Sequence, residues 1–157
     1  MKTAGFILAG MFFVSCDRQE SMSSEKMGDI PWIEAKEGDW NEIQFGGEGS
    51  AQWSDGVLHL EAGVELTGSR FSGELPEMPY ELELEALKEV GSDFFCGLTF
   101  PVSSKEECLT FIVGGWGGGT VGVSSIDGMD ASENETTTYG NFEEGRWYAI
   151  RLLVEEG

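Results

Sequence analysis

The sequence predicts an all-β fold, a β-sandwich of the jelly-roll type. Apolar and polar residues alternate along residues 80–86 and 146–154, which is the period of a strand with one buried face. Glycine makes up 23 of the 157 residues, about twice the usual share, and many of these glycines stand in turn signals. No long amphipathic helical pattern is present. Many short strands joined by glycine-rich turns are typical of sandwiches and jelly rolls.

The first segment has the composition of a secretion signal. Lys2 precedes an apolar run over residues 4–14, which is too short to span a bilayer as a mature helix. The run ends in Phe13-Val14-Ser15-Cys16, which resembles a bacterial lipoprotein signal, with Phe where Leu is usual. We therefore expect residues 1–15 to be removed and Cys16 to be lipidated. The alternative is an ordinary secreted protein in which Cys16 has no such role.

The segment after Cys16 reads as a tether. Residues 17–29 are polar and rich in serine, as expected between a lipid anchor and a folded domain. The domain is expected over residues 30–157, in the cell envelope, on the periplasmic side or at the outer surface. The chain ends in Glu155-Glu156-Gly157, a turn signal where a sandwich strand normally meets a hairpin partner. We expect the last strands of the jelly roll to be lacking from this chain.

The two alternating segments predict which side chains form the core. One side carries Tyr80, Leu82, Leu84 and Ala86 in the first segment, and Tyr148, Ile150, Leu152 and Val154 in the second. Shorter strands are expected over residues 42–45, 51–53, 57–61, 64–67, 94–100, 109–113 and 120–124. Between two of them, Asp55-Gly56 supplies residues that tolerate positive φ, so a tight hairpin is expected there.

Charge and histidine content exclude several classes of function. The chain has 9 Lys and Arg against 29 Asp and Glu, for a net charge of -20, which would repel a nucleic acid backbone. The single histidine, His59, excludes a zinc site with several histidines. It alternates with Leu58 and Leu60 in an expected strand, where a position on the polar face fits better than catalysis.

The loop over residues 124–138 is the strongest candidate for chemistry. It carries Asp127, Asp130 and Glu133, and glycoside hydrolysis commonly uses a protonated and an ionised carboxyl close together. These three are the candidate catalytic residues. The same ligand types suit Ca2+, although the loop lacks the ligand order of an EF-hand, and no other cofactor is expected. The alternative is a solvated acidic loop in a protein that is acidic throughout.

Three further residues are candidate sugar ligands. Trp116 stands among glycines, which leave few neighbouring side chains to bury its indole ring, so the ring could stack on a sugar. Alternatively, the glycines let a strand pack closely on a core ring. Asp93 either serves turn chemistry or faces the surface beside Trp116. Asn134 adds an amide to the acidic loop. The other tryptophans, Trp32, Trp40, Trp53 and Trp147, are expected in the core.

Cys96 and Cys108 lie in consecutive expected strands, and a compartment outside the cytoplasm permits a disulfide. The two sulfur atoms meet only if the strand register brings them together. A centred hairpin would pair Cys96 nearer Ile112, so both outcomes stay open.

Residues 91–101 and 114–137 resemble lipoproteins of environmental bacteria related to the 3-keto-disaccharide hydrolase family. Trp147-Tyr148, followed by alternating apolar residues, is similar to the closing strands of laminin-G-like and other concanavalin-like domains. The likeness extends from Trp40 to Val154. It implies a concanavalin-like jelly roll that acts on or binds carbohydrate outside the cytoplasm. Such folds include glycosidases, lectins and adhesive modules, so fold alone does not choose among them.

Three functions therefore follow as hypotheses. In the first, a loop carboxylate removes the acidic C2 hydrogen of a 3-keto sugar and so starts cleavage of the glycosidic bond. In the second, the domain binds carbohydrate without catalysis through Trp116 and the acidic loop. In the third, it is a structural envelope lipoprotein that contacts another protein through a sheet face. Carbohydrate is the expected partner, with membrane contact only through the lipid anchor.

Overall fold

The computed structural model describes the backbone of residues 5–16 and all atoms of residues 32–104 and 106–155. Its strands are β1 (Gly5–Cys16), β2 (Trp40–Glu42), β3 (Ala51–Ser54), β4 (Val57–Glu61), β5 (Ser69–Phe71), β6 (Tyr80–Lys88), β7 (Cys96–Pro101), β8 (Cys108–Gly114), β9 (Thr120–Ser124), β10 (Thr138–Tyr139) and β11 (Trp147–Val154). The only helical element of this part is the single turn α1 (Gly115–Gly118). The all-β prediction is confirmed.

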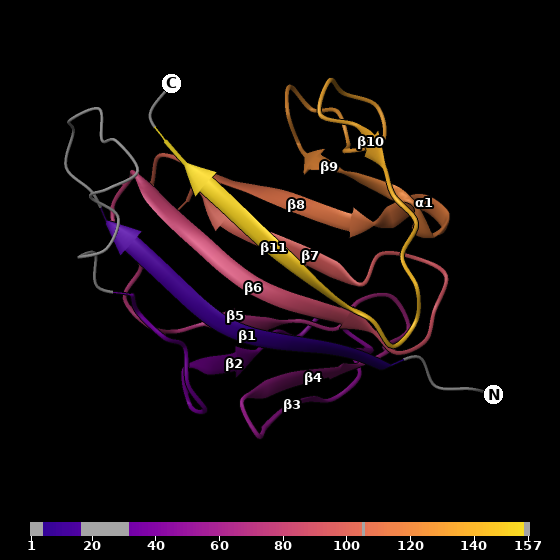
Figure 1. Cartoon of the computed structure of the whole chain (residues 1–157), viewed down its shortest axis with the longest axis horizontal. Coiled ribbons are helices and arrows are strands. Elements are labelled where there is room, and N and C mark those ends of the chain that lie inside the picture. The colour runs from indigo at the N-terminus through magenta and orange to yellow at the C-terminus, as the bar shows by residue number, and fades with distance from the viewer. Residues whose placement is uncertain (1–4, 17–31, 105, 156–157) are drawn as a thin grey trace.

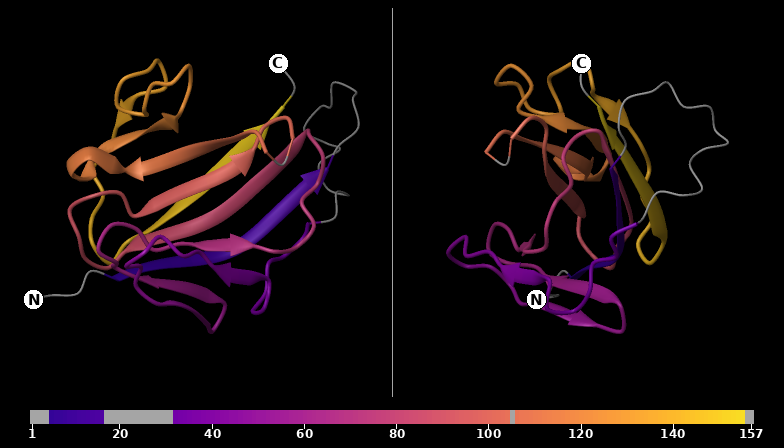
Figure 2. Two further views of the ribbon diagram at one scale, coloured as in Figure 1. Left: turned by 180° about the vertical axis from the view of Figure 1, so that it is seen from behind. Right: turned by 90° about the vertical axis from the view of Figure 1, so that its left-hand side faces the viewer.

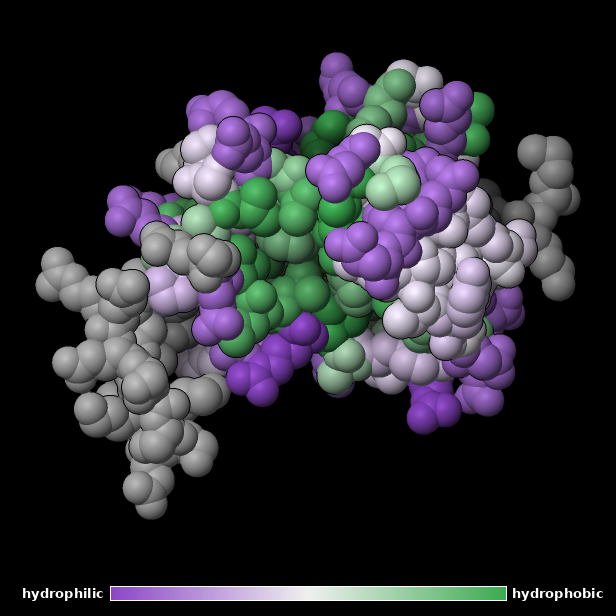
Figure 3. Space-filling model, turned by 90° about the horizontal axis from the view of Figure 1, so that it is seen from above, coloured by the Kyte–Doolittle hydropathy of each residue, from purple (hydrophilic) through white to green (hydrophobic). Residues whose placement is uncertain are grey.

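Two antiparallel sheets form the body of the molecule (Figures 1 and 2). The five-stranded sheet has the order β11-β6-β1-β4-β3, and the four-stranded sheet has the order β10-β9-β8-β7. A separate two-stranded ribbon joins β2 and β5. The two larger sheets face each other, and from above an apolar strip is visible in a hollow of the surface (Figure 3).

The core lies between β6 and β11 on one side and β7 and β8 on the other. The predicted inward residues of β6, from Tyr80 to Ala86, are at most 4% exposed. On β11, Ile150 and Val154 are buried, and the two other predicted residues pack against the same cluster. Both core predictions are confirmed, because period-two alternation assigns the faces of a strand directly.

Most of the shorter strands follow their turn signals. The strand predicted over residues 42–45 is wrong apart from Glu42, which ends β2. Residues 57–61 and 120–124 are strands with the predicted bounds. Asp55 and Gly56 adopt φ of 52° and 78° in the hairpin between β3 and β4, as their turn chemistry predicts. The strand predicted over residues 64–67 is wrong. Val64 is 86% exposed and donates its amide to the carbonyl of Gly47 in a loop, so its apolar character was misleading.

The tryptophans divide between partly buried and exposed positions. Trp40 and Trp53 are partly buried and stack with ring centroids 6.1 Å apart. Trp32 is 38% exposed and Trp147 is 39% exposed, so the core prediction is wrong for these two. Trp147 alternates with the inward-facing Tyr148 and therefore lies on the outer face of the five-stranded sheet.

A hydrogen bond joins the two layers. Tyr80 on β6 donates its hydroxyl to the carbonyl of Pro101 at the end of β7. Burial raises the pKa of Tyr80 to about 12, with a smaller contribution from the charge of Cys108. The phenol therefore keeps its proton over the physiological range and remains a donor.

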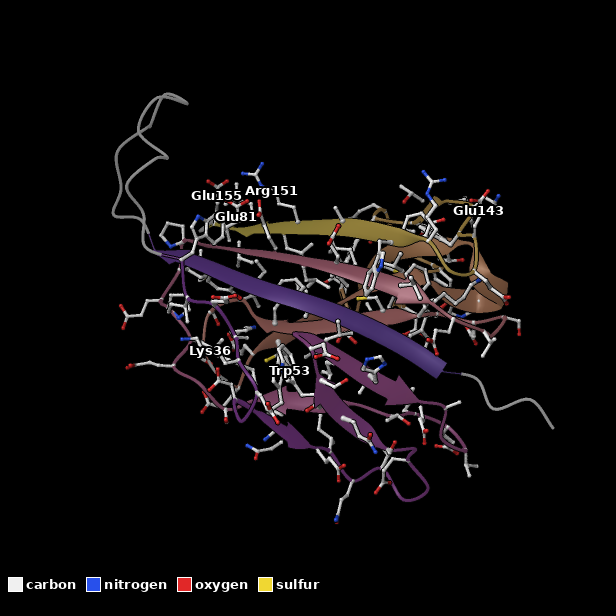
Figure 4. The ribbon with its side chains drawn as sticks, turned by 60° about the horizontal axis from the view of Figure 1, so that its bottom comes forward. Lys36, Trp53, Glu81, Glu143, Arg151 and Glu155 are labelled. Atoms are coloured by element: carbon white, nitrogen blue, oxygen red, sulfur yellow. The ribbon has the colours of Figure 1, made fainter. Side chains whose placement is uncertain are left out.

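The outer face of the five-stranded sheet carries one ion-pair group. Arg151 on β11 contacts Glu81 and lies 3.5 Å from Glu83, both on β6. Glu81 and Arg151 lie together on this face in Figure 4. Hydrogen bonding to Glu81 and its charge raise the pKa of Arg151. Arg151 is in register with Glu83 and reaches Glu81 diagonally, so it supplies a cation to an acidic residue that is only 6% exposed.

The predicted leader segment is a central strand in this structure. Gly5–Cys16 pairs with β4 along one side and with β6 along the other. The predictions of cleavage after residue 15 and of lipidation at Cys16 concern processing, and they stay predictions. The tether at 17–29 lies outside the described residues. Within the described part of the chain, no helix is long and apolar enough to cross a membrane.

Candidate functional site

The outer face of the four-stranded sheet forms a floor around Ile112 on β8. Phe111 and Val113 pack in the core, so Ile112 between them points to the opposite face of β8. In register with Ile112 stand Gly97 on β7 and Gly122 on β9. Gly97 is exposed, with the Phe94 ring beside it, whereas a Cβ at Gly122 would meet Ala131 and Thr136 of the acidic loop. The surface beside Ile112 is therefore open on the β7 side and covered on the β9 side.

Trp116 is presented by a left-handed turn at the end of this floor. Its φ and ψ are 47° and 58°, and Gly114 and Gly117 beside it also have positive φ. A non-glycine residue in this conformation costs about 1–2 kcal/mol. Glycine is required at position 115, since a Cβ there would lie 2.9 Å from Cγ2 of Ile112. The turn leaves Trp116 50% exposed, so the expectation of a core ring is wrong and that of a displayed ring is confirmed.

A hollow of about 160 Å³ lies against the Trp116 ring. Its lining consists of Asp93, Phe94, Ile112 and Trp116. Asp93 is exposed, and its Oδ1 accepts a hydrogen bond of 2.8 Å from the amide of Phe94. Its Oδ2 has no hydrogen bond within the described residues. Both interpretations of Asp93 therefore hold: one oxygen serves the turn, and the carboxylate also faces the surface beside Trp116.

Polar and aromatic groups extend the same face beyond the hollow. Thr99 on β7 and Thr110 on β8 join their hydroxyls at 2.9 Å. They lie two residues from Gly97 and Ile112, a step of about 7 Å along the strands. Tyr139, which is 80% exposed, pairs in register with Thr120 and so lies on this face of the sheet. Sequence reasoning missed these three residues, although the alternation of β7 and β8 would have placed the two threonines beside Ile112.

The acidic loop is organised from within by Asn134. This amide is buried, and its Nδ2 donates to the carbonyls of Val123, Met129 and Asp130 at 2.8, 3.3 and 2.9 Å. Its Oδ1 accepts hydrogen bonds from the amide and the hydroxyl of Thr136. The structure thus gives Asn134 a structural role, and its role as a sugar ligand stays a prediction.

The candidate catalytic carboxyls project from this loop into solvent. Asp127, Asp130 and Glu133 are all exposed. The loop follows the end of β9, whereas the Trp116 turn precedes its beginning (Figure 1). The loop folds back over β9, because a Cβ at Gly122 would lie 2.9 Å from the carbonyl oxygen of Ala131 and 3.1 Å from Oγ1 of Thr136. None of the three carboxyls lines the hollow, so the structure does not bring them together with Trp116.

Metal-ligating groups were also sought in the described ranges. No group of three or more His, Cys, Asp or Glu side chains lies close enough there to hold a metal ion. The Ca2+ prediction for the acidic loop thus has no ligand cluster behind it in that part of the chain.

The two strand cysteines do not form a disulfide with each other. Cys96 pairs in register with Val113, and Cys108 pairs with Pro101 at the far end of β7. The two positions are about 16 Å apart along the ladder, well beyond the reach of a disulfide. Burial raises the pKa of the Cys96 thiol to about 12, so it remains protonated and is not a nucleophile.

A larger hollow of about 320 Å³ lies beside β2 and β5. Its lining consists of Asn41, Glu42, Ile43, Gln44 and Arg70. It contains polar groups but no aromatic ring on which a sugar could stack. The hollow beside Trp116 is therefore the better candidate for sugar binding.

Comparison with protein-family models, curated proteins and solved structures gave no match to this chain.

Proposed function

We propose that the domain binds carbohydrate without catalysis, on the outer face of its four-stranded sheet. The observation that carries the proposal is the half-exposed ring of Trp116, held beside the Asp93 carboxylate in one hollow. The domain is a concanavalin-like jelly roll in this proposal, related to the 3-keto-disaccharide hydrolase family. It is anchored in the cell envelope through a lipid on Cys16.

The chemistry of the hollow suits a pyranose ring. The indole of Trp116 offers an apolar surface to the C–H face of a sugar, with Phe94 and Ile112 beside it. Oδ2 of Asp93 accepts a hydrogen bond from a sugar hydroxyl, and a bond to a charged acceptor is stronger than one between neutral groups. A second sugar unit would extend past Ile112 and Gly97 toward Thr99 and Thr110.

Charge defines the class of carbohydrate. The chain has a net charge of -20, and Asp93 adds a carboxylate inside the hollow. Uronic acids and sulfated sugars would be repelled both by the overall field and by this local charge. The preferred ligands are therefore neutral glycans.

The hydrolase hypothesis remains a separate proposal that draws on the family resemblance. It needs a general base within hydrogen-bonding reach of the C2 hydrogen of a bound 3-keto sugar. Asp127, Asp130 and Glu133 lie on the acidic loop, away from the lining of the hollow. Geometry thus favours binding over cleavage for a sugar stacked on Trp116.

Titration calorimetry with a panel of neutral and anionic oligosaccharides tests the binding proposal. We expect neutral glycans to bind, and Trp116→Ala to weaken binding by about tenfold or more because stacking is lost. The matched control is Trp147→Ala, a partly exposed tryptophan on the outer face of the other sheet. Absence of binding by the folded protein, or an equal loss in both variants, would overturn the proposal. A parallel assay for product release from 3-keto glycosides tests the hydrolase hypothesis.

A further inference from the structure

The central strand of the five-stranded sheet, β1, pairs with a neighbour on each of its two edges. Gly5–Cys16 pairs with β4 from Gly5↔Glu61 to Ala9↔Val57, and with β6 from Phe6↔Lys88 to Cys16↔Tyr80. In the strand order, β4 and β6 are neighbours of β1 and not of each other. Among the described residues, strand β1 is therefore the only ladder connection between the β3–β4 hairpin and the β6–β11 pair.

The fit of β1 against β6 is irregular in the middle. Ala9 pairs with Glu85 and Phe13 with Glu83, so Gly10, Met11 and Phe12 face the single residue Leu84. Strand β6 itself is regular: it has nine residues, and eight of them, from Leu87 to Tyr80, pair continuously with β11 on its other side. The irregularity thus belongs to β1. A regular strand of nine residues would match β6 better than Gly5–Cys16 does.

Residues 5–16 also belong to the predicted secretion signal. Their composition is that of a secretion signal that ends at Cys16, and a segment inserted in or removed at a membrane cannot also be a central strand. Its departure exposes the amide and carbonyl groups of β4 and β6 that had faced it. The β3–β4 hairpin would also lose its support, and an isolated two-stranded hairpin is marginally stable.

We propose that the slot between β4 and β6 is a strand-acceptor site, and that residues 5–16 are its built-in, exchangeable occupant. Its ligand is an extended peptide with alternating apolar side chains, antiparallel to both neighbouring strands. Main-chain hydrogen bonds supply affinity, and alternate side chains supply specificity, as in other cases of strand addition. Processing at Cys16 opens the site. This last step rests on the proposed lipoprotein signal and is independent of carbohydrate binding.

The first experiment removes the irregularity in the intact chain. Deletion of Met11 and Phe12 lets Gly10 face Leu84 and keeps the pairs on either side in register. We expect the deletion to raise the urea midpoint of unfolding. As a matched control, deletion of two residues at positions 21 and 22, outside any described strand, should leave the midpoint unchanged. A midpoint that is unchanged or lowered by the first deletion would overturn the proposal.

The second experiment tests exchange. A protease site is placed within residues 17–29 of the full chain, and the chain is cut after purification. Labelled peptides with lysine tags are then added: residues 5–16, the same segment lacking Met11 and Phe12, and a scrambled version. We expect the shortened peptide to displace the cut segment with an affinity about tenfold higher than that of the natural one. Equal exchange of the scrambled peptide, or none by either matched peptide, would contradict an acceptor site.

A mass measurement of the protein from bacterial membranes tests processing at Cys16 separately from the acceptor site. Retention of residues 1–15 would remove the processing step and leave the acceptor site intact. Failure of exchange with a confirmed cleavage would remove the acceptor site and leave the lipoprotein proposal intact. Neither result bears on glycan titration, which reports only on the hollow beside Trp116.

Discussion

The two ends of strand β9 use their polar and aromatic groups in opposite ways. At its end, Asn134 is buried and directs its amide at the main chain of the acidic loop. Before its beginning, the turn around Trp116 accepts backbone strain and displays a large ring to solvent. The comparison shows a buried amide that organises the acidic loop at one end and a strained, displayed ring at the other, and such strain persists only where the surrounding structure sustains it.

The largest expected effect is a loss of stability when Asn134 in the acidic loop is replaced. Asn134→Ala removes the donor to three carbonyls and the acceptor for the amide of Thr136. The carbonyls of Met129 and Asp130 keep their main-chain hydrogen bonds, so most of the loss falls on the buried amide and its bonds to Val123 and Thr136. We expect a loss of about 2–3 kcal/mol in the free energy of unfolding, measured in urea. The exposed neighbour Glu133→Gln serves as the control, with a change below about 0.5 kcal/mol. A similar small change for Asn134→Ala would mean that the loop does not depend on this amide.

The stabilities of two substitutions at Trp116 test the strain in the turn, because strain reverses the usual order of glycine and alanine. Glycine normally destabilises relative to alanine because it has more freedom in the unfolded chain. At position 116 the positive φ penalises alanine and spares glycine. We therefore expect Trp116→Gly to be more stable than Trp116→Ala by about 1 kcal/mol in thermal or urea unfolding. If the alanine variant is the more stable one, the turn is not strained.

The smallest expected effect compares one carboxylate at each end. Asp93→Asn removes the charge from the hollow, and Asp130→Asn removes one from the loop. We expect glycan affinity to fall by about fivefold in the first variant, as for loss of one charged hydrogen bond, and to stay unchanged in the second. Calorimetry on both proteins measures this difference. A larger loss in Asp130→Asn would move the binding site to the acidic loop.

Much of the fold could be predicted because its main strands alternate cleanly. Strands β6 and β11 each have one apolar face, so the core residues follow from the sequence pattern. The strand expected at 64–67 was wrong because an apolar residue such as Val64 can lie exposed in a loop with its amide satisfied elsewhere. A pairing such as β2 with β5 depends on contacts between distant segments, which periodicity does not encode.

The candidate site was predictable only in part. Trp116 stood out because glycines surround it, and Asp93 was one of its candidate neighbours. Thr99, Thr110 and Tyr139 share a face with Trp116 only through the register of separate strands. The structural role of Asn134 could not be predicted, because an amide that organises a loop has the same local sequence signature as one that binds a ligand.

The bond from Tyr80 to Pro101 has a mechanical consequence for the whole sandwich. Apolar packing between two sheets resists separation but allows small displacements of one sheet past the other, because its contacts are non-directional. A hydroxyl on β6 that reaches a carbonyl on β7 is directional, and it acts as a pin between the layers. Shear of one layer against the other would break this hydrogen bond, so it adds about 1 kcal/mol of directional resistance to the apolar packing between the sheets.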